Sequence, residues 1–287
     1  MSRQTSIGPL GPGRARRLAS PMLFAGLASI ALAAGAGAQL RPLDPLDWRD
    51  LEGPPISASL GADLFFDQRA SLAGTSGRLF QLAVFRVVWR LDRVAVAVSG
   101  TPVRVFDDRD VFASPAQGAL PAEDGRRIDA GDMRLSTLVR LNRSDALIQA
   151  SLRFGVRLPT TDERIGLDRD QTDFFGTLGG RVHRGRMDLS GELGIGILGS
   201  RAGIDQTDPL LYGLRAMAKV GAVSPFVELT GQHDTRENGP RRGTEDLGEI
   251  RVGARVGSES WLSVAAVKGL ATFSPGFGLR VRLGRGF

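Results

Sequence analysis

Long stretches of this sequence alternate apolar and polar residues, and this alternation constrains the fold more than any other feature. In one stretch, Ile148 and Phe154 share one parity, whereas Gln149 and Arg153 share the other. Successive side chains of a β-strand point to opposite faces, so period two over nine or more residues predicts strands and fits no helix. About twelve strands are expected, near residues 56–67, 78–90, 93–106, 131–142, 145–158, 171–184, 186–199, 209–221, 223–235, 246–257, 259–268 and 275–287.

These strands and their connections are typical of a membrane barrel. Strands of globular proteins centre on about five or six residues, whereas strands that cross a bilayer need about nine to eleven. Short and long connections alternate, as in outer-membrane β-barrels with short periplasmic turns and longer extracellular loops. We therefore expect an all-β fold, a single antiparallel transmembrane barrel in residues 56–287. The short joins lie at 91–92, 143–144, 185, 222 and 258, and the long ones near 68–77, 107–130, 159–170, 200–208, 236–245 and 269–274.

The N-terminus has the order of a signal peptide. Basic residues precede the apolar run LASPMLFAGLASIALAAGAGA, which closes on small residues. This order predicts a signal peptide in residues 1–38, cleaved before Gln39, and its Gly and Ala content disfavours the alternative of a membrane anchor. Cleavage removes four arginines and no acids, so the formal net charge falls from +6 to +2 (6 − 4), and the high pI does not indicate nucleic-acid binding. Residues 39–55, rich in proline and charge, are expected to form a periplasmic leader.

The C-terminal stretch GFGLRVRLGRGF also alternates, and it ends on an aromatic residue. Its odd-numbered face, with Phe277 and Leu279, is expected to contact lipid, and its even-numbered face to line the lumen. This ending is similar to the terminal signal that the barrel-assembly machinery of outer membranes reads, which makes that machinery an expected partner. Aromatic rings favour the membrane–water interface. The residues expected in such a girdle are Trp89, Trp261, Tyr212 and Phe287.

The polar face of the strands carries many charged residues that should point into the lumen. Charged groups there need water or partners. One interpretation is a polar conduit whose basic rings favour anions; the other is a narrow barrel plugged by arginine–carboxylate pairs. Barrels of about twelve strands lie between filled eight-stranded and open sixteen-stranded ones, so both interpretations stay open. The expected lumen-lining residues are Arg134, Arg140, Arg153, Arg157, Arg181, Arg215, Lys219, Arg251, Arg255, Arg280, Arg282, Asp63, Asp132, Asp173, Asp188, Glu192, Glu228 and Glu249.

Residues for catalysis and metal binding are few. The sequence has two histidines, His183 and His233, and no cysteine. Neither histidine stands in a pattern that supplies a nucleophile, a base and an orienting group together, so no enzyme is expected. Asp107, Asp108 and Asp110 could bind calcium weakly, but arginine is interleaved with them, as in many solvated loops. We expect no cofactor and no metal ion.

The segment RFGVRLPTTDERIGLDRDQTDFFGTLGGRVHRGRMDLSGELGIGILG (153–199) carries a motif in which a strand ends, a loop follows and an acid opens the next strand. The residues that carry it are Phe154, Gly155, Arg157, Pro159, Thr160 and Asp173. The segment resembles the outer-membrane barrel family named for the meta-pathway of phenol degradation, whose members have F-G-x-K-x-P-T-G here. In this sequence Arg157 replaces the lysine and Thr161 replaces the final glycine. The resemblance implies a transport barrel, in some members for hydrophobic aromatic compounds.

These patterns predict a channel or porin-like transporter for passive movement of small solutes, anionic or aromatic, across the outer membrane of a Gram-negative envelope. The alternative is a plugged structural or surface-interaction barrel without transport activity. Expected partners are outer-membrane lipid, the barrel-assembly machinery and a small-molecule solute, but no nucleic acid.

Overall fold

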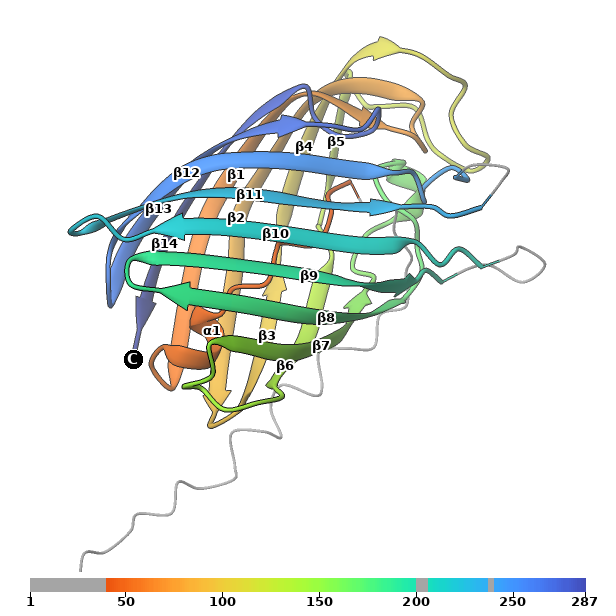
Figure 1. Cartoon of the computed structure of the whole chain (residues 1–287). Helices are drawn as coiled ribbons and strands as arrows, with labels where there is room; N and C mark the ends of the chain where they lie inside the picture. The colour runs from red at the N-terminus through yellow and green to blue at the C-terminus, as the bar shows by residue number, and fades with distance from the viewer. Residues whose placement is uncertain (1–39, 200–205, 237–239) are drawn as a thin grey trace, which may run out of the picture. The chain divides into compact units, whose positions relative to one another are not determined.

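The strands of this protein close into a ring (Figure 1). The structure is a computed structural model that describes residues 40–199, 206–236 and 240–287, which belong to one compact unit, Ala34–Phe287. The expected signal peptide lies outside the described residues. The strands are β1 (Ile56–Ala70), β2 (Thr75–Leu91), β3 (Val94–Gly100), β4 (Val103–Val111), β5 (Arg126–Asp129), β6 (Met133–Arg140), β7 (Ile148–Leu158), β8 (Asp173–Arg184), β9 (Met187–Ile197), β10 (Leu210–Ala218), β11 (Val223–His233), β12 (Leu247–Gly257), β13 (Ser260–Gly269) and β14 (Phe277–Gly286).

The ring closes at β1, which pairs with β2 on one side and with β14 on the other. Leu60 of β1, for example, faces Phe85 of β2 and Leu283 of β14. All pairings are antiparallel, and the strands from β6 to β14 pair in chain order. Closure satisfies the backbone groups of both ends of the sheet, as hydrocarbon surroundings require.

The 14 labelled strands make 12 crossings of the barrel wall. Strands β3 and β4 form one crossing, and β5 and β6 form the crossing beside it. Ser99 faces Arg134 and Arg104 faces Asp129, so one register continues across the interruption. Pro102 lies at this interruption and has no N–H to donate to a neighbouring strand. The expectation of an all-β, closed antiparallel barrel of about twelve strands is confirmed.

The connection between β1 and β2 is shorter than expected. Both strands run on past the ends that the sequence predicts, so that only residues 71–74 join them. Ala70 and Ala73 are buried there in a cluster with Leu167 of a later loop. Burial of these apolar side chains therefore extends the β1–β2 hairpin beyond the residues in which apolar and polar side chains alternate.

The connection between β6 and β7 is longer than expected, because residues 141–147 separate the strands instead of a tight join. The side chain of Asn142 donates to the carbonyl of Ile148 at 2.7 Å and accepts from the N–H of Ala150 at 2.9 Å. These bonds satisfy backbone groups that a ladder would otherwise pair. The strict alternation of short and long connections is thus broken at two places.

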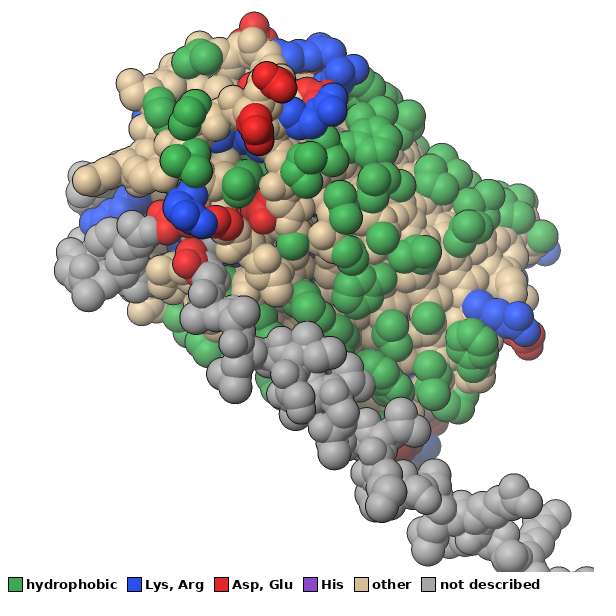
Figure 2. Space-filling view, turned by 180° about the vertical axis from the view of Figure 1, so that it is seen from behind, with side chains coloured by type: hydrophobic (Ala, Val, Ile, Leu, Met, Phe, Trp, Pro, Cys, Tyr) green, Lys and Arg blue, Asp and Glu red, His purple; other side chains and the backbone are tan. Residues whose placement is uncertain are grey.

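The two faces of the wall differ in chemistry as the alternation predicts. On β9, Leu189, Leu193 and Ile195 are more than half exposed on the outer face, whereas Asp188 and Glu192 are buried on the inner face. Figure 2 shows hydrophobic side chains spread over the outside of the strands, with charged side chains gathered mainly toward the ends. An outward apolar band of this kind suits hydrocarbon. Among the described residues, no helix has the length and apolar character needed to span a bilayer.

Leu193→Arg is expected to lower the free energy of unfolding in lipid vesicles by about 2–4 kcal/mol, the cost of arginine near the bilayer midplane. Leu193 lies near the middle of β9 and is 56% exposed on its outer face. Leu147→Arg is the control, because Leu147 is 70% exposed in the connection between β6 and β7. Urea unfolding measures both variants. Equal losses would mean that the outer face of β9 does not contact lipid.

Three of the four aromatic residues expected in the membrane girdle lie on the outside. Trp89 is on the outer face of β2, next to Val88, which points inward and is buried. The ring of Tyr212 lies across Gly231 of the neighbouring strand, where a Cβ would collide with the Tyr212 hydroxyl. Phe287 is 65% exposed beyond β14. These positions agree with interfacial contacts of the rings.

Trp261 is the exception, because it points into the lumen. Its ring stacks with Arg255, whose guanidinium carbon lies 4.0 Å from the ring centroid, and it covers Gly284 of β14. Its neighbour Leu262 is exposed on the outer face of β13. The expectation of a membrane contact for Trp261 is therefore wrong, since a cation–π contact inside the barrel holds the indole ring.

Candidate functional site

Residues 40–52 lie inside the ring of strands, and we call this segment the plug. Figure 1 shows it as a red-orange trace that runs within the ring and reaches α1 (Arg49–Glu52). The wall binds its backbone: the Thr230 hydroxyl donates to the Leu43 carbonyl at 2.6 Å, and the Leu46 N–H donates to Glu192 Oε1 at 2.8 Å. The sequence predicts a periplasmic leader for residues 39–55; residues 40–52 occupy the lumen instead, because their side chains complement the inner wall.

Apolar side chains hold the plug at two levels. Leu46, Trp48 and Leu51 are at most 3% exposed around the start of α1, and Leu40 is 7% exposed at the other end of the plug. Each buried side chain of this size contributes about 1.5–3 kcal/mol. The end of the plug near α1 is therefore the more firmly anchored. Their wall partners are Val88, Ala95, Ala97 and Leu138 for the first cluster, and Phe65, Leu79, Phe106 and Val267 among others for the second.

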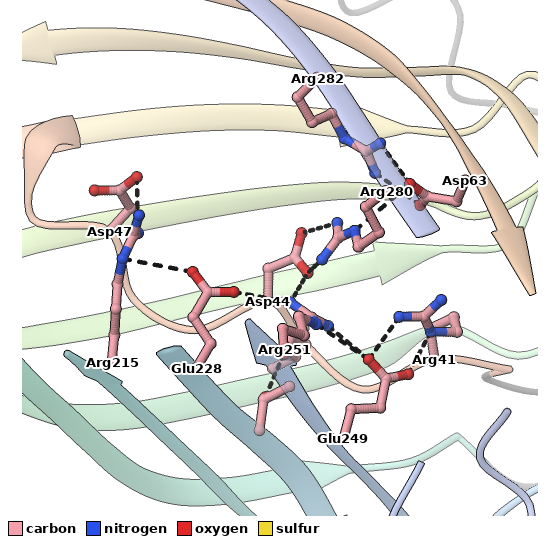
Figure 3. Close-up of polar contacts among 12 residues, drawn as sticks. Arg41, Asp44, Asp47, Asp63, Arg215, Glu228, Glu249, Arg251, Arg280 and Arg282 are labelled. Carbon is pink, nitrogen blue, oxygen red and sulfur yellow. Dashed lines mark hydrogen bonds and ion pairs between the residues drawn. The ribbon is translucent and has the colours of Figure 1, made fainter. Parts of the chain in front are cut away.

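Asp44 of the plug is held by arginines from two strands (Figure 3). Arg251 of β12 donates to Asp44 Oδ1 at 2.7 Å. Arg280 of β14 donates to Oδ1 at 2.9 Å and to Oδ2 at 3.2 Å. Such two-point guanidinium–carboxylate contacts are strong and directional. The Asp44 side chain nevertheless stays 57% exposed, so part of the carboxylate faces open lumen.

The other acids of the plug also meet arginines of the wall. The plug has four acids and two arginines, a formal charge of −2, and it thereby offsets positive charge on the wall. Arg41, near the far end, makes the opposite kind of contact and donates through two nitrogens to Glu249. The remaining pairs are Asp47 with Arg215 (3.0 Å), Asp50 with Arg86, and Glu52 with Arg181.

The wall carries ion pairs of its own, both between strands and within β12. Most of the residues expected to line the lumen take part in them, and Figure 3 shows several beside the plug. These pairs fix the arginines in place whether or not a plug acid is present. The pairs are Arg153 with Glu192 (2.8 Å), Arg282 with Asp63 (2.7 Å), Arg181 with Asp188 (2.7 Å), Arg215 with Glu228 (3.4 Å) and Arg251 with Glu249 (3.0 Å).

A second charged cluster surrounds Arg157 at the end of β7. Arg157 donates to Asp132 at 2.7 Å and to Asp173 at 2.8 Å, and it lies 3.8 Å from Asp168. Asp168, in the loop after β7, also contacts Arg104 and is fully buried. Burial and the nearby Asp132 raise the pKa of Asp168 to about 7, although Arg104 and Arg157 act in the opposite direction. This cluster is rich in charge and buried, and its acids depend on arginines for partners.

Four of the expected lumen residues have other surroundings. Arg134 lines the lumen, and its buried Nε has no hydrogen-bond partner among the described residues. Arg255 stacks on the inward ring of Trp261. Arg140 ends β6, and Lys219 is exposed in the connection after β10, so both lie beside turns rather than deep in the barrel.

A cavity of about 240 Å³ remains in the lumen beside the plug. Arg86 and Arg134 line it together with Ser99 and Ser136, and Phe226 adds an aromatic surface. Pockets that hold drug-sized ligands measure about 300–1,000 Å³. With the plug in place, the lumen therefore has room for water and the smallest solutes only.

The two histidines lie outside the lumen cluster, each beside an acid. His183 Nδ1 is 3.4 Å from Asp188, and His233 Nδ1 is 2.8 Å from Asp246. Both histidines are more than half exposed. The geometry brings no hydroxyl nucleophile to either pair in the described part of the chain, so each is an exposed histidine–carboxylate contact at a strand end.

The acids considered for calcium contact arginines in the structure. Asp107 accepts from Arg78 at 2.9 Å and from Arg126 at 3.0 Å, and Asp108 accepts from Arg127 at 3.1 Å. In residues 40–199, 206–236 and 240–287, no group of three or more His, Cys, Asp or Glu side chains is placed to hold a metal ion.

Sequence reasoning missed the plug acids as partners of the wall, although the plug carries a signal. Leucines occur at 40, 43 and 46, and aspartates at 44, 47 and 50, each three residues apart. A free leader has no need for such regularity. An extended segment bound along a surface, in contrast, repeats its contacts at fixed steps.

No protein-family model and no curated protein matches the sequence. Among solved structures, the protein is similar to an outer-membrane channel from Pseudomonas putida F1, with a TM-score of 0.53 and 14% identity over 90% of this chain and 97% of that chain. It is also similar to the translocator domain of the autotransporter NalP from Neisseria meningitidis (TM-score 0.46, 13% identity, 82% and 89% covered) and to LpxR from Salmonella typhimurium (0.42, 10%, 80% and 100%).

The fold is therefore that of the outer-membrane β-barrels, and the lumen with its plug is the candidate functional site. The comparisons support this class but not the meta-pathway family in particular, so membership of that family stays a prediction. Arg157 and Asp173, two residues that carry the resemblance, form an ion pair in the structure. Their pairing gives the motif a structural role in holding β7 to β8.

Proposed function

We propose that this protein is an outer-membrane channel for small anionic solutes and that the plug closes it in the described state. The observation that carries the proposal is the arginine-lined lumen, where plug acids complete the pairing of wall arginines such as Arg251 and Arg280. Arg86 has its ion pair with Asp50 of the plug. Fixed positive charge in a confined polar pore concentrates anions and excludes cations.

The size of the barrel supports a conducting lumen once the plug is absent. Eight-stranded barrels are filled by their own side chains, whereas barrels of about sixteen strands enclose an aqueous channel. Here 12 crossings leave room for a length of extended backbone with its side chains. Without the plug, water fills the space that the plug occupied. The wall side chains do not fill it, because ion pairs already hold them to one another.

The envelope location is part of the proposal. The expected signal peptide, residues 1–38, would leave a chain that begins at Gln39, directly before the plug. The outward apolar side chains suit outer-membrane lipid, and β14 with the Phe287 that follows it suits recognition by the barrel-assembly machinery. The small-molecule solute would then pass between the periplasm and the outside.

Conductance across planar bilayers tests the channel. A chain that begins at Gln39 should conduct weakly, whereas a chain that begins at Gly53, and so lacks the plug, should conduct strongly and prefer anions. Both chains keep β1 to β14 and the closure of the ring. If the chain from Gly53 inserts, folds and passes no ions, the channel proposal is wrong.

A second candidate function is a structural or surface-interaction barrel that stays closed. The apolar anchors favour it, since Leu46, Trp48 and Leu51 bury almost all of their surface against the wall. This candidate requires that the lumen stays impermeable when the plug is removed. The same bilayer recording therefore decides between the two functions.

A further inference from the structure

We propose that Asp44 and Asp47 of the plug occupy the binding sites of the transported solute, which is an elongated anion with two carboxylates separated by at most about 10 Å, the reach of three extended residues. Such a solute displaces the plug by binding the wall arginines that hold Asp44 and Asp47. This inference rests on the proposed channel function, for which it names the solute class and the means of opening.

The first site is the arginine pair around Asp44. Arg251 is 2% exposed and Arg280 is 14% exposed, so both guanidinium groups are held inside the wall. Glu249 binds Arg251 at 3.0 Å, and Asp63 lies 3.5 Å from Arg280. The wall thus presents a preformed carboxylate site, and a group that binds there is recognised by charge and by two-point geometry.

The second site is Arg215, which contacts Asp47 at 3.0 Å. Glu228 lies 3.4 Å from Arg215 and 3.5 Å from Arg251, and therefore links the two sites through the wall. Both sites keep their arginines in place by contacts that do not involve the plug. A solute with two acidic groups can meet both at once, and binding at two points raises its effective concentration at the second.

The contacts of Asp44 and Asp47 allow a solute to replace these acids at the wall arginines. Asp44 is 57% exposed to the lumen, so a solute can approach the arginines beside it. Asp47 is also bound within the plug by Arg49, at 2.9 Å to Oδ1. When Asp47 leaves Arg215, it therefore keeps a partner of opposite charge. Trp48 and Leu51 keep the plug tethered near α1 while the part before Trp48 moves.

The spacing sets the length of the solute. Asp44 and Asp47 are three residues apart, and an extended chain spans at most about 3.3–3.6 Å per residue. Pro45 and Leu46 between them are buried and apolar. A linear α,ω-dicarboxylate with an apolar middle matches this arrangement. Malonate, whose carboxylates share one carbon, can reach only one site.

Thiol labelling of the whole chain tests the inference. The chain has no cysteine, so Pro45→Cys places a single thiol in the buried stretch between the two acids. Decanedioate should speed its labelling by a membrane-impermeant thiol reagent about 10-fold, within the usual range of coupling between two ligands. Malonate at equal ionic strength should leave the rate unchanged, and a cysteine introduced instead at exposed Ser144 should not respond to either compound.

A second variant removes the solute mimic itself. Asp44→Asn, combined with Pro45→Cys, should raise the labelling rate of the introduced thiol without any added compound, because the arginines lose the carboxylate that holds the plug. Equal acceleration by malonate and decanedioate, or an unchanged rate on adding Asp44→Asn, would overturn the inference. If decanedioate does not speed labelling but the chain from Gly53 conducts, the inference fails and the channel stands. If labelling responds but that chain does not conduct, the site stands and the channel fails.

Discussion

Arg157→Met is expected to lower the free energy of unfolding by about 3–5 kcal/mol, the usual cost of leaving a buried charge without its partner. Arg157 is 3% exposed and donates to both Asp132 and Asp173, with Asp168 also within 4 Å. Methionine fills similar space but neutralises none of these acids. The variant therefore isolates the electrostatic role of the guanidinium, and urea unfolding in lipid vesicles measures it.

The loss in this variant should depend on pH. Without Arg157, Asp168 loses one of the two cations that oppose the rise of its pKa, which is about 7 in the parent protein, so the folded variant keeps this proton to a higher pH. Above about pH 7 the folded variant therefore binds more protons than the folded parent, and its stability relative to the parent falls as pH rises. The deficit relative to the parent protein should grow above about pH 7 and shrink on acidification.

Arg143→Met is the matched control for this replacement. Arg143 also pairs with an aspartate, Asp145 at 2.9 Å, but the Arg143 side chain is 80% exposed in the connection between β6 and β7. Exposed pairs of this kind contribute about 0–1 kcal/mol. A loss at Arg157 no larger than at Arg143, or one that ignores pH, would show that the cluster does not depend on charge.

The alternation of residues was enough to predict the wall, because strand parity is a local property. Each side chain of a strand points in or out according to its position, and lipid on one side selects apolar residues along the whole strand. Hence Phe154 is exposed and Arg153 buried on β7, as the sequence indicates. The sequence also predicted where the connections lie, apart from the two whose lengths local side-chain contacts change.

The plug could not be predicted in the same way, because its position depends on distant partners. Asp44 meets Arg280, which lies 236 residues further along the chain. The three-residue spacing of leucines and aspartates in residues 40–50 indicates a bound segment, but nothing in the local pattern identifies the surface that binds it. The sequence shows acids in the leader and surplus arginines on the inner face of the strands, and these charges are complementary. Only the closed ring brings them together.

Trp261 shows why residue type alone is a weak guide at a strand end. Tryptophan favours the membrane interface, yet the parity of β13 assigns its exposed face to Leu262 and Val264. Strand parity decides the direction, and the contact with Arg255 then stabilises the ring inside the barrel. The same parity applied to Trp89 gives the outer face. Parity is therefore the better predictor wherever the two disagree.

Reversing the charge of Arg86 and Arg134 is expected to turn the barrel that lacks the plug from anion-selective to cation-selective. Both side chains line the lumen cavity, and Arg86 has its ion pair with Asp50, which leaves with the plug. Glutamate at both positions therefore changes the lumen charge without opposing a wall carboxylate in a formed pair, unlike a reversal at Arg153, which contacts Glu192.

The zero-current potential of the chain from Gly53 in a salt gradient measures this change. Two exchanges, each worth two charge units, lower the lumen charge by four units, and the sign of the potential should invert. The effect should be strongest at low salt, where the screening length of about 30 Å at 0.01 M exceeds the width of the pore. Arg143→Glu with Arg164→Glu changes the net charge equally but at exposed positions outside the lumen, and should leave the potential nearly unchanged. An equal response in both double variants would mean that ions sense the overall charge of the protein, and that Arg86 and Arg134 do not line the path of conduction.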